Sequence, residues 1–182
     1  MFFAKNKKLI LKCVTYLSAV LIGFLLASAW YLLPKKNLAL PLVLSKVFPM
    51  SYQTNIVKET QDNENFRRVL FTGKNSQLVV MSIPPGGEIG EEIHKYTEQT
   101  LFFLSGTGEA ILNDKKTPIG PGDVVVVVPG TKHNFINTGT SDLKVYTVYA
   151  PPNHIDGRVH RTKADADADT ADEAVGETPP LK

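Results

Sequence analysis

Between residues 66 and 149, turn-forming residues divide the chain into short apolar runs, and this segmentation limits the folds open to it. Each run has three to seven residues, which suits a β-strand and is short for a helix. Gly, Pro, Asn and Asp gather between the runs, where tight turns need them. The runs predicted to be strands are 68–72, 77–83, 91–94, 100–104, 109–112, 117–119, 124–128, 131–136 and 143–149. Short, regularly spaced strands predict an all-β fold, an antiparallel sandwich or barrel.

Two histidine-containing segments lie on these predicted strands. Glu92 and His94 are two residues apart, so on a strand both side chains point to one face. If that face lines a barrel interior, the strand that carries His133 can bring a second imidazole to the same point. Two imidazoles and one carboxylate suit Fe(II), and Zn(II) and Mn(II) accept the same donors. The histidines could instead be hydrogen-bonded pocket residues without a metal, and Glu92 could be a surface charge.

The spacing of the two segments resembles a known family. The residues that carry the resemblance are Gly86, Glu92-x-His94, Gln99 and Gly106 in the first segment, and Gly122, Gly130-x-x-His133 and Asn137 in the second. Together they resemble the two motifs of the cupin superfamily, which implies a small antiparallel β-barrel, or jelly roll, over residues 65–154. Gly106, Gly130 and Asn137 are expected to serve turns and backbone hydrogen bonds.

The resemblance also implies a ligand set, with two departures from the usual pattern. Typical cupins supply His-x-His and Glu from the first motif and one His from the second. By position, the candidate metal ligands here are Glu92, His94, Gln99 and His133. Glu92 stands at the place of the first His and Gln99 at the place of the Glu, so the charge of the set is kept. Gln99 is a weak ligand and could instead hydrogen-bond a metal-bound water or the bound molecule.

Two functions follow from this reading. One is a metal-dependent enzyme with Fe, Mn or Zn, an oxygenase or isomerase that acts on a small molecule, although no residue can be assigned as catalytic. The alternative is a non-enzymatic barrel that binds or senses a sugar-like or carboxylate compound. Cupin resemblance also implies a homodimer. Because it supports a fold more strongly than an activity, the substrate is not predicted.

The N-terminal region predicts a membrane segment. Residues 13–33 carry no charge, and as a helix they would span about 30 Å, the thickness of the hydrocarbon layer. Four lysines precede the segment and two follow it, so the N-terminus is expected in the cytoplasm and the barrel on the extracytoplasmic side. Cleavage near Ala29, which would give a secreted or periplasmic chain, is the alternative because 27–29 is a small-x-small sequence.

Charge and composition divide the rest of the chain. Residues 1–36 contain six lysines and no acid, and residues 37–182 contain 14 basic and 18 acidic residues, so nucleic-acid binding is not expected. The predicted organisation is an anchor over 1–36, a linker over 37–64, the barrel over 65–154 and an acidic tail over 155–182. The Ala- and Asp-rich tail is expected to be solvated, disordered or weakly helical, with His154 and His160 exposed.

Overall fold

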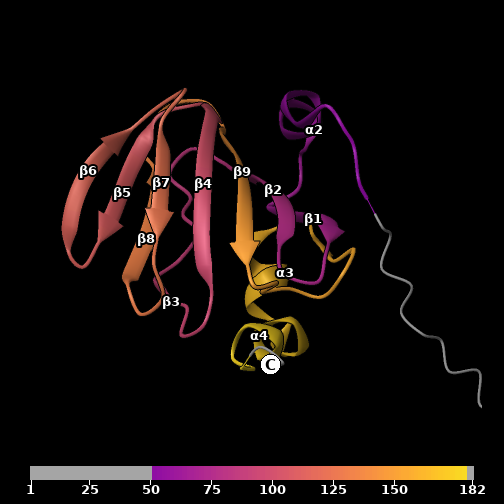
Figure 1. Ribbon diagram of the computed structural model, residues 1–182. Helices are drawn as coiled ribbons and strands as arrows, with labels where there is room; N and C mark the ends of the chain where they lie inside the picture. The colour runs from indigo at the N-terminus through magenta and orange to yellow at the C-terminus, as the bar shows by residue number, and fades with distance from the viewer. Residues whose placement is uncertain (1–50, 180–182) are drawn as a thin grey trace, which may run out of the picture. The chain divides into compact units, whose positions relative to one another are not determined.

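The computed structural model describes residues 51–179, in which ten strands form two antiparallel sheets (Figure 1). The six-stranded sheet has the order β10-β1-β2-β9-β4-β7, and the four-stranded sheet has the order β3-β8-β5-β6. The first contains β1 (Arg67–Thr72), β2 (Gln77–Ile83), β4 (Glu98–Ser105), β7 (Val124–Val127), β9 (Leu143–Ala150) and β10 (Val159–His160). The second contains β3 (Glu92–Ile93), β5 (Gly108–Leu112), β6 (Lys115–Ile119) and β8 (Lys132–Asn137). The predicted antiparallel jelly roll is confirmed.

The core between the sheets follows from alternation along the strands. In β9, every second residue from Leu143 to Tyr149 is buried, and in β4 the buried positions are Gln99, Leu101 and Phe103. Leu101 and Phe103 pack with Phe135 of β8 in the apolar core. Towards one end of the same inner face the buried side chains are polar. There Gln99 of β4 lies opposite Tyr149 of β9 in register. The strand pattern therefore places an apolar core and a polar pocket on one continuous surface.

Two motif residues have the structural roles that the sequence predicts. Gly106 has a φ of +82°, and a Cβ there would lie 2.5 Å from the carbonyl oxygen of Asp142, so a side chain would clash with backbone. The Asn137 amide donates to the carbonyl oxygens of Ile83 and Ser141, each at 2.8 Å. Gly106 allows two backbone segments to approach closely, and Asn137 bonds two others together. Neither residue lines the polar pocket.

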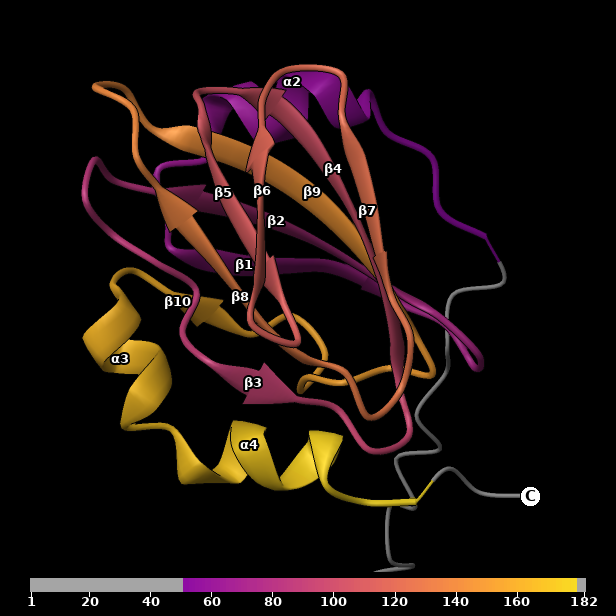
Figure 2. The same ribbon diagram turned by 90° about the vertical axis from the view of Figure 1, so that its left-hand side faces the viewer.

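Helices occur on both sides of the predicted barrel. Helix α2 (Ile56–Asp62) lies in the predicted linker and packs over β2 and β9. After the barrel, β10 pairs with β1, and α3 (Lys163–Asp167) and α4 (Thr170–Gly176) follow. Figure 2 shows α3 beside β10 and α4 below β3. The acidic run is therefore part of the fold.

Of the two alternatives for the tail, disorder is wrong over these helices and helix formation is observed, for a reason visible in their caps. Most of their residues are exposed, as expected, but Ala166 and Asp172 are buried. Thr162 and Asp165 form a capping box at α3, and the side chain of Asp169 accepts from the backbone N–H of Asp172 at the start of α4. Acids that suggest disorder in composition therefore act as helix N-terminal residues. His154 and His160 are also buried rather than exposed, with 7% and 3% of their surface accessible.

Two further predictions concern the apolar strand over 124–128 and the membrane segment. The apolar strand predicted over 124–128 is observed as β7, but it lies at a sheet edge, and Val124 and Val126 are about half exposed. The predicted membrane segment, residues 13–33, lies outside the described residues. Among residues 51–179, none of the helices is both long and apolar enough to cross a membrane.

Candidate metal centre and adjoining cavity

Three of the four predicted ligands converge where β3 meets β8. Glu92 lies directly opposite His133 in the register of these strands, and His94 follows β3 by one residue. The backbone carbonyl of His94 accepts from the N–H of Gly130 at 2.8 Å, which holds the end of β3 against the turn before β8. One possible ligand atom from each of Glu92, His94 and His133 lies within 4.8 Å of the others. The strand parity read from the sequence thus brings these side chains together.

The tautomer of His133 is set by the backbone. Its Nδ1 lies 2.9 Å from the carbonyl oxygen of Thr131, and because a carbonyl only accepts, Nδ1 carries the hydrogen. Burial lowers the pKa of His133, so the ring is neutral and Nε2 has a free lone pair. Nε2 has no hydrogen-bond partner among the described residues and lies 3.9 Å from Oε2 of Glu92. This arrangement presents the ring in the form that binds a metal.

Glu92 supplies the negative charge of the cluster. Burial opposes its ionisation, but His94, Arg67 and His133 together outweigh burial and lower the pKa of the carboxyl below its ordinary value. Its Oε2 lies 3.4 Å from Nε2 of His94, and its Oε1 lies 3.8 Å from a guanidinium nitrogen of Arg67. His94 Nε2, like that of His133, is buried without a hydrogen-bond partner in the described chain. Two unpartnered imidazole nitrogens beside a carboxylate are a donor set that fits a divalent cation.

Gln99, the fourth predicted ligand, is buried on β4 and bound to a tyrosine. Its Nε2 donates to the hydroxyl of Tyr149 at 2.9 Å, while its Oε1 has no partner within residues 51–179. Burial raises the pKa of Tyr149, which keeps the hydroxyl neutral. The Tyr149 ring stands 5.9 Å from the ring of His94, edge to face. Gln99 thus has a free amide oxygen beside the cluster, and its role as a ligand stays a prediction.

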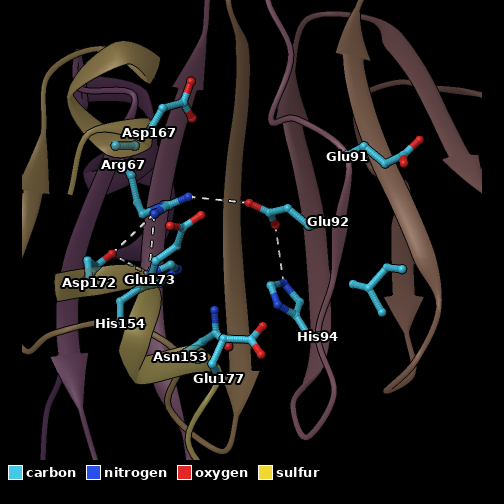
Figure 3. Close-up of a pocket in the computed structure, with 13 residues that line it drawn as sticks. Arg67, Glu91, Glu92, His94, Asn153, His154, Asp167, Asp172, Glu173 and Glu177 are labelled. Atoms are coloured by element: carbon cyan, nitrogen blue, oxygen red, sulfur yellow. Dashed lines mark hydrogen bonds and ion pairs between the residues drawn. The ribbon is translucent and has the colours of Figure 1, made fainter. Parts of the chain in front are cut away.

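A second polar cluster adjoins the first and was not foreseen from the sequence. The Asp172 carboxylate of α4 accepts from Nδ1 of His154 at 2.8 Å and from the backbone N–H of Ile155 at 2.7 Å. Arg67 lies 3.4 Å from the same carboxylate, and its guanidinium also extends towards Glu92 (Figure 3). Burial opposes ionisation of Asp172, but these partners hold its pKa at about 2. The side chain of Gln77 fixes the nearby loop by bonding the backbone N–H and carbonyl of His154.

No local signal in the sequence identifies this cluster. Arg67 and Asp172 are 105 residues apart, and Arg67 and His154 are 87 residues apart. They meet because β10 adds to β1 and brings the C-terminal helices beside the start of β1. An argument from strand parity, which works within β3 and its neighbours, does not reach across such separations.

A cavity of about 250 Å³ lies between the two clusters. The barrel supplies Arg67, Glu92 and His94, and the C-terminal segment supplies the opposite wall (Figure 3). The other lining residues are Glu91, Ile93, Asn153, His154, Ala166, Asp167, Asp172, Glu173, Gly176 and Glu177. The candidate metal cluster is therefore open to a space that can hold a small molecule.

Comparison with known proteins gives one family and several relatives. Residues 79–149 match the family described as Cupin domain. The Bacillus subtilis protein YrkC, described as uncharacterized, is 43% identical over 131 residues, which cover 69% of this chain and 70% of the relative. The uncharacterized protein L612 of Acanthamoeba polyphaga mimivirus is 37% identical over 112 residues, 59% of this chain and 70% of that one.

Solved structures agree with the fold. The crystal structure of BH2720 from Bacillus halodurans is 39% identical with a TM-score of 0.65, and the match covers 66% of this chain and 96% of that chain. A conserved protein with a double-stranded β-helix domain from Klebsiella pneumoniae is 25% identical with a TM-score of 0.50. That match covers 62% of this chain and 100% of the other. These similarities establish the architecture around the clusters and name no substrate.

Proposed function

Because this chain belongs to the cupin superfamily, we propose that it is a divalent-metal protein that acts on a small polar molecule. Glu92, His94 and His133 would hold the metal, with Fe(II), Mn(II) or Zn(II) as the candidates. One observation carries the proposal: two buried imidazole nitrogens without partners face one ionised carboxylate within 4.8 Å. Buried polar atoms are as a rule hydrogen-bonded to protein groups or to ordered water, so the convergence of two unpartnered imidazole nitrogens on one carboxylate supports a ligand role.

The proposed reaction class is that of an oxygenase or an isomerase. A bound divalent metal would supply positive charge and coordination positions for a substrate, since three protein ligands leave such positions free. The protein's own groups prepare that site. Thr131 fixes the tautomer of His133, and Arg67 helps to keep Glu92 ionised. Gln99 is proposed either as a further ligand or as a hydrogen-bond partner of the bound molecule.

Elemental analysis of the purified full-length chain, followed by thermal unfolding with added metal, tests this proposal. We expect stoichiometric metal and an increased melting temperature, because a ligand at 100 times its Kd stabilises a protein by about 2.7 kcal/mol. Glu92→Ala and His133→Ala should each abolish both effects. Glu91→Ala is the matched control, because Glu91 precedes Glu92 in the chain but its own side chain is 67% exposed. A chain without metal whose melting temperature none of the three ions changes would contradict the proposal.

A non-enzymatic binding or sensing role is the second candidate, and Arg67 favours it. Its guanidinium lies 3.8 Å from Glu92 and gives that carboxylate a cationic partner that does not depend on metal. The pocket could therefore bind a small molecule without a metal. Binding that survives EDTA supports this role, and binding abolished by EDTA contradicts it.

We also propose that residues 13–33 anchor the chain in a membrane with the barrel on the extracytoplasmic side. The support is the uncharged run of 21 residues and the excess of lysines before it. Mass spectrometry of the native chain tests this against the alternative of cleavage near Ala29. A mature chain that begins at Trp30 would contradict the anchor.

A homodimer is proposed through the exposed edge of the six-stranded sheet. In the described chain β7 is bonded only to β4, and Val124 and Val126 expose apolar surface beside its free edge. Uncharged edge strands of this kind tend to pair with another chain. Val126→Lys should convert a dimer to a monomer in light scattering, whereas a monomeric parent protein would contradict the proposal.

A further inference from the structure

One wall of the cavity does not come from the barrel. It is formed by Ala166 and Asp167 at the end of α3 and by four residues from Asp172 to Glu177, in and just after α4. The buried Asp172 holds this wall against the barrel through His154, Arg67 and the N–H of Ile155. Asp172 therefore holds the backbone of this wall in place, and the side chains of the wall determine the chemistry that a molecule beside the metal cluster meets.

Outside the metal cluster, three buried residues that line this cavity have polar atoms without partners in the described chain: His154, Arg67 and Asn153, whose free Oδ1 is an acceptor. The Nε2 of His154 and the Nε of Arg67 make no hydrogen bond within residues 51–179, and both side chains are more than nine-tenths buried. Because the Asp172 carboxylate accepts from Nδ1 of His154, the neutral ring leaves Nε2 as an acceptor. Arg67 can only donate. A ligand that satisfies both atoms must offer a donor to His154 and an acceptor to Arg67, and a hydroxyl-bearing molecule offers both.

The charge of the lining disfavours anionic molecules of this kind. Arg67 faces the carboxylates of Glu92 and Asp172, and four more acidic side chains border the cavity: Glu91, Asp167, Glu173 and Glu177. Lys132, Lys163 and Lys95 pair with three of these, but none of the lysines lines the cavity. Exposed ion pairs of this kind are weak, so the carboxylates still set the local field. A bound metal would add positive charge on the barrel side of the cavity, but at the C-terminal wall an anionic group would meet repulsion that a cationic one would not.

We propose that the cavity between His94 and α4 is a subsite for a small hydroxyl-bearing molecule that lacks negative charge and binds best when it carries an amine. His154 and Arg67 recognise its hydroxyl groups, and the carboxylates of the C-terminal wall select against anions. The proposal deepens the proposed function, on which it rests, by naming the class of molecule held beside the metal cluster. A cavity volume of about 250 Å³ leaves room for a small molecule of that class.

Three probes with one ring and different charges test the selectivity: glucosamine, glucose and glucuronate. Isothermal titration calorimetry on the full-length chain in mild detergent, near neutral pH and at low salt, gives the three dissociation constants. We expect glucosamine to bind about threefold more tightly than glucose and about tenfold more tightly than glucuronate, a range of about 1.4 kcal/mol. Raising the salt concentration should reduce the preference. Glucuronate binding as tightly as glucosamine, or failure of all three to bind, overturns the proposal.

Two variants test the recognition of hydroxyl groups and the role of the C-terminal wall separately. His154→Phe keeps a ring in place and removes the acceptor, and it should weaken glucose binding about tenfold. The double variant Glu173→Gln, Glu177→Gln changes only exposed positions, and it should remove most of the discrimination against glucuronate with metal content unchanged. Unchanged discrimination in this variant overturns the role of the wall. If the chain binds no metal but keeps the charge ranking, the metal proposal fails while the subsite stands.

Discussion

The two polar clusters of this pocket share Arg67 but differ in how well the hydrogen-bonding capacity of their carboxylates is satisfied. In the cluster around Asp172, the carboxylate accepts hydrogen bonds of 2.8 Å from His154 and 2.7 Å from the N–H of Ile155. In the cluster around Glu92, the shortest contact to an imidazole is 3.4 Å, and two ring nitrogens have no partner in the described chain. The short hydrogen bonds to the Asp172 carboxylate fit a structural role, although His154 Nε2 and Arg67 Nε beside it also lack partners in the described chain. A carboxylate without short hydrogen bonds, next to two imidazole nitrogens with free lone pairs, fits a site that binds a cation.

Asp172→Ala should produce the largest effect, because it removes the centre of the satisfied cluster. Arg67 would lose one carboxylate partner while buried, and breaking a buried pair in this way costs about 3–5 kcal/mol of unfolding free energy. Denaturant unfolding measures the loss. Glu173→Ala, the next residue on α4 but exposed, is the control and should unfold close to the parent. A small effect at Asp172 would mean that this cluster does not hold the C-terminal wall.

The stability of the protein should fall in acid in two stages. Burial lowers the pKa of His133 and His154 in the fold, so the unfolded chain takes up protons first and stability declines as the pH falls below about 6.5. The pKa of Asp172 is depressed to about 2, so its contribution is present above the unfolded value near 4 and is lost as the pH falls towards 2. That lower stage is worth about 2–3 kcal/mol.

Urea midpoints measured across the acid range check both stages. Asp172→Asn should remove the lower stage and leave the upper one, because the amide does not titrate in this range. His154→Phe should reduce the upper stage and also part of the lower one, because it removes a hydrogen bond that lowers the pKa of Asp172. If the parent and Asp172→Asn lose stability in parallel between pH 4 and 2, the depressed pKa of Asp172 does not contribute to folding.

Gln99→Glu tests the other cluster, the one around Glu92. A carboxylate at this buried position, next to Tyr149, would add charge to the unsatisfied cluster and should lower metal-free stability by about 1–3 kcal/mol. Added metal should recover this loss and give a larger increase in melting temperature than in the parent. Gln99→Met, similar in size and uncharged, should lose the Tyr149 bond and show no larger metal effect. If metal raised the melting temperature equally in all three chains, Gln99 would not take part in the metal site.

How far the sequence predicts each cluster depends on the distance along the chain between its members. The parity of Glu92 and His94 on one strand is a local property, and the motif spacing supplies His133. The satisfied cluster joins Arg67 to residues 87 and 105 positions away through β10, a two-residue strand with no clear pattern. Composition also misleads there, because the acids of 163–176 cap helices and one of them is buried. Likewise, nothing in the valine run of β7 tells an edge strand from a central one.

Lys95→Ala should have the smallest effect, and it decides what holds the C-terminal wall in place. Lys95 and Glu177 form an ion pair of 2.5 Å between the loop after β3 and the end of α4, but their side chains are 61% and 56% exposed. Exposed pairs gain little because water screens them, so the urea midpoint should match that of the parent at physiological salt. Asp172 is buried and screened far less, so the wall should depend on it instead. If Lys95→Ala lost as much stability as Asp172→Ala, the exposed ion pair at the rim of the cavity would also hold the C-terminal wall, and the assignment of that role to Asp172 alone would be wrong.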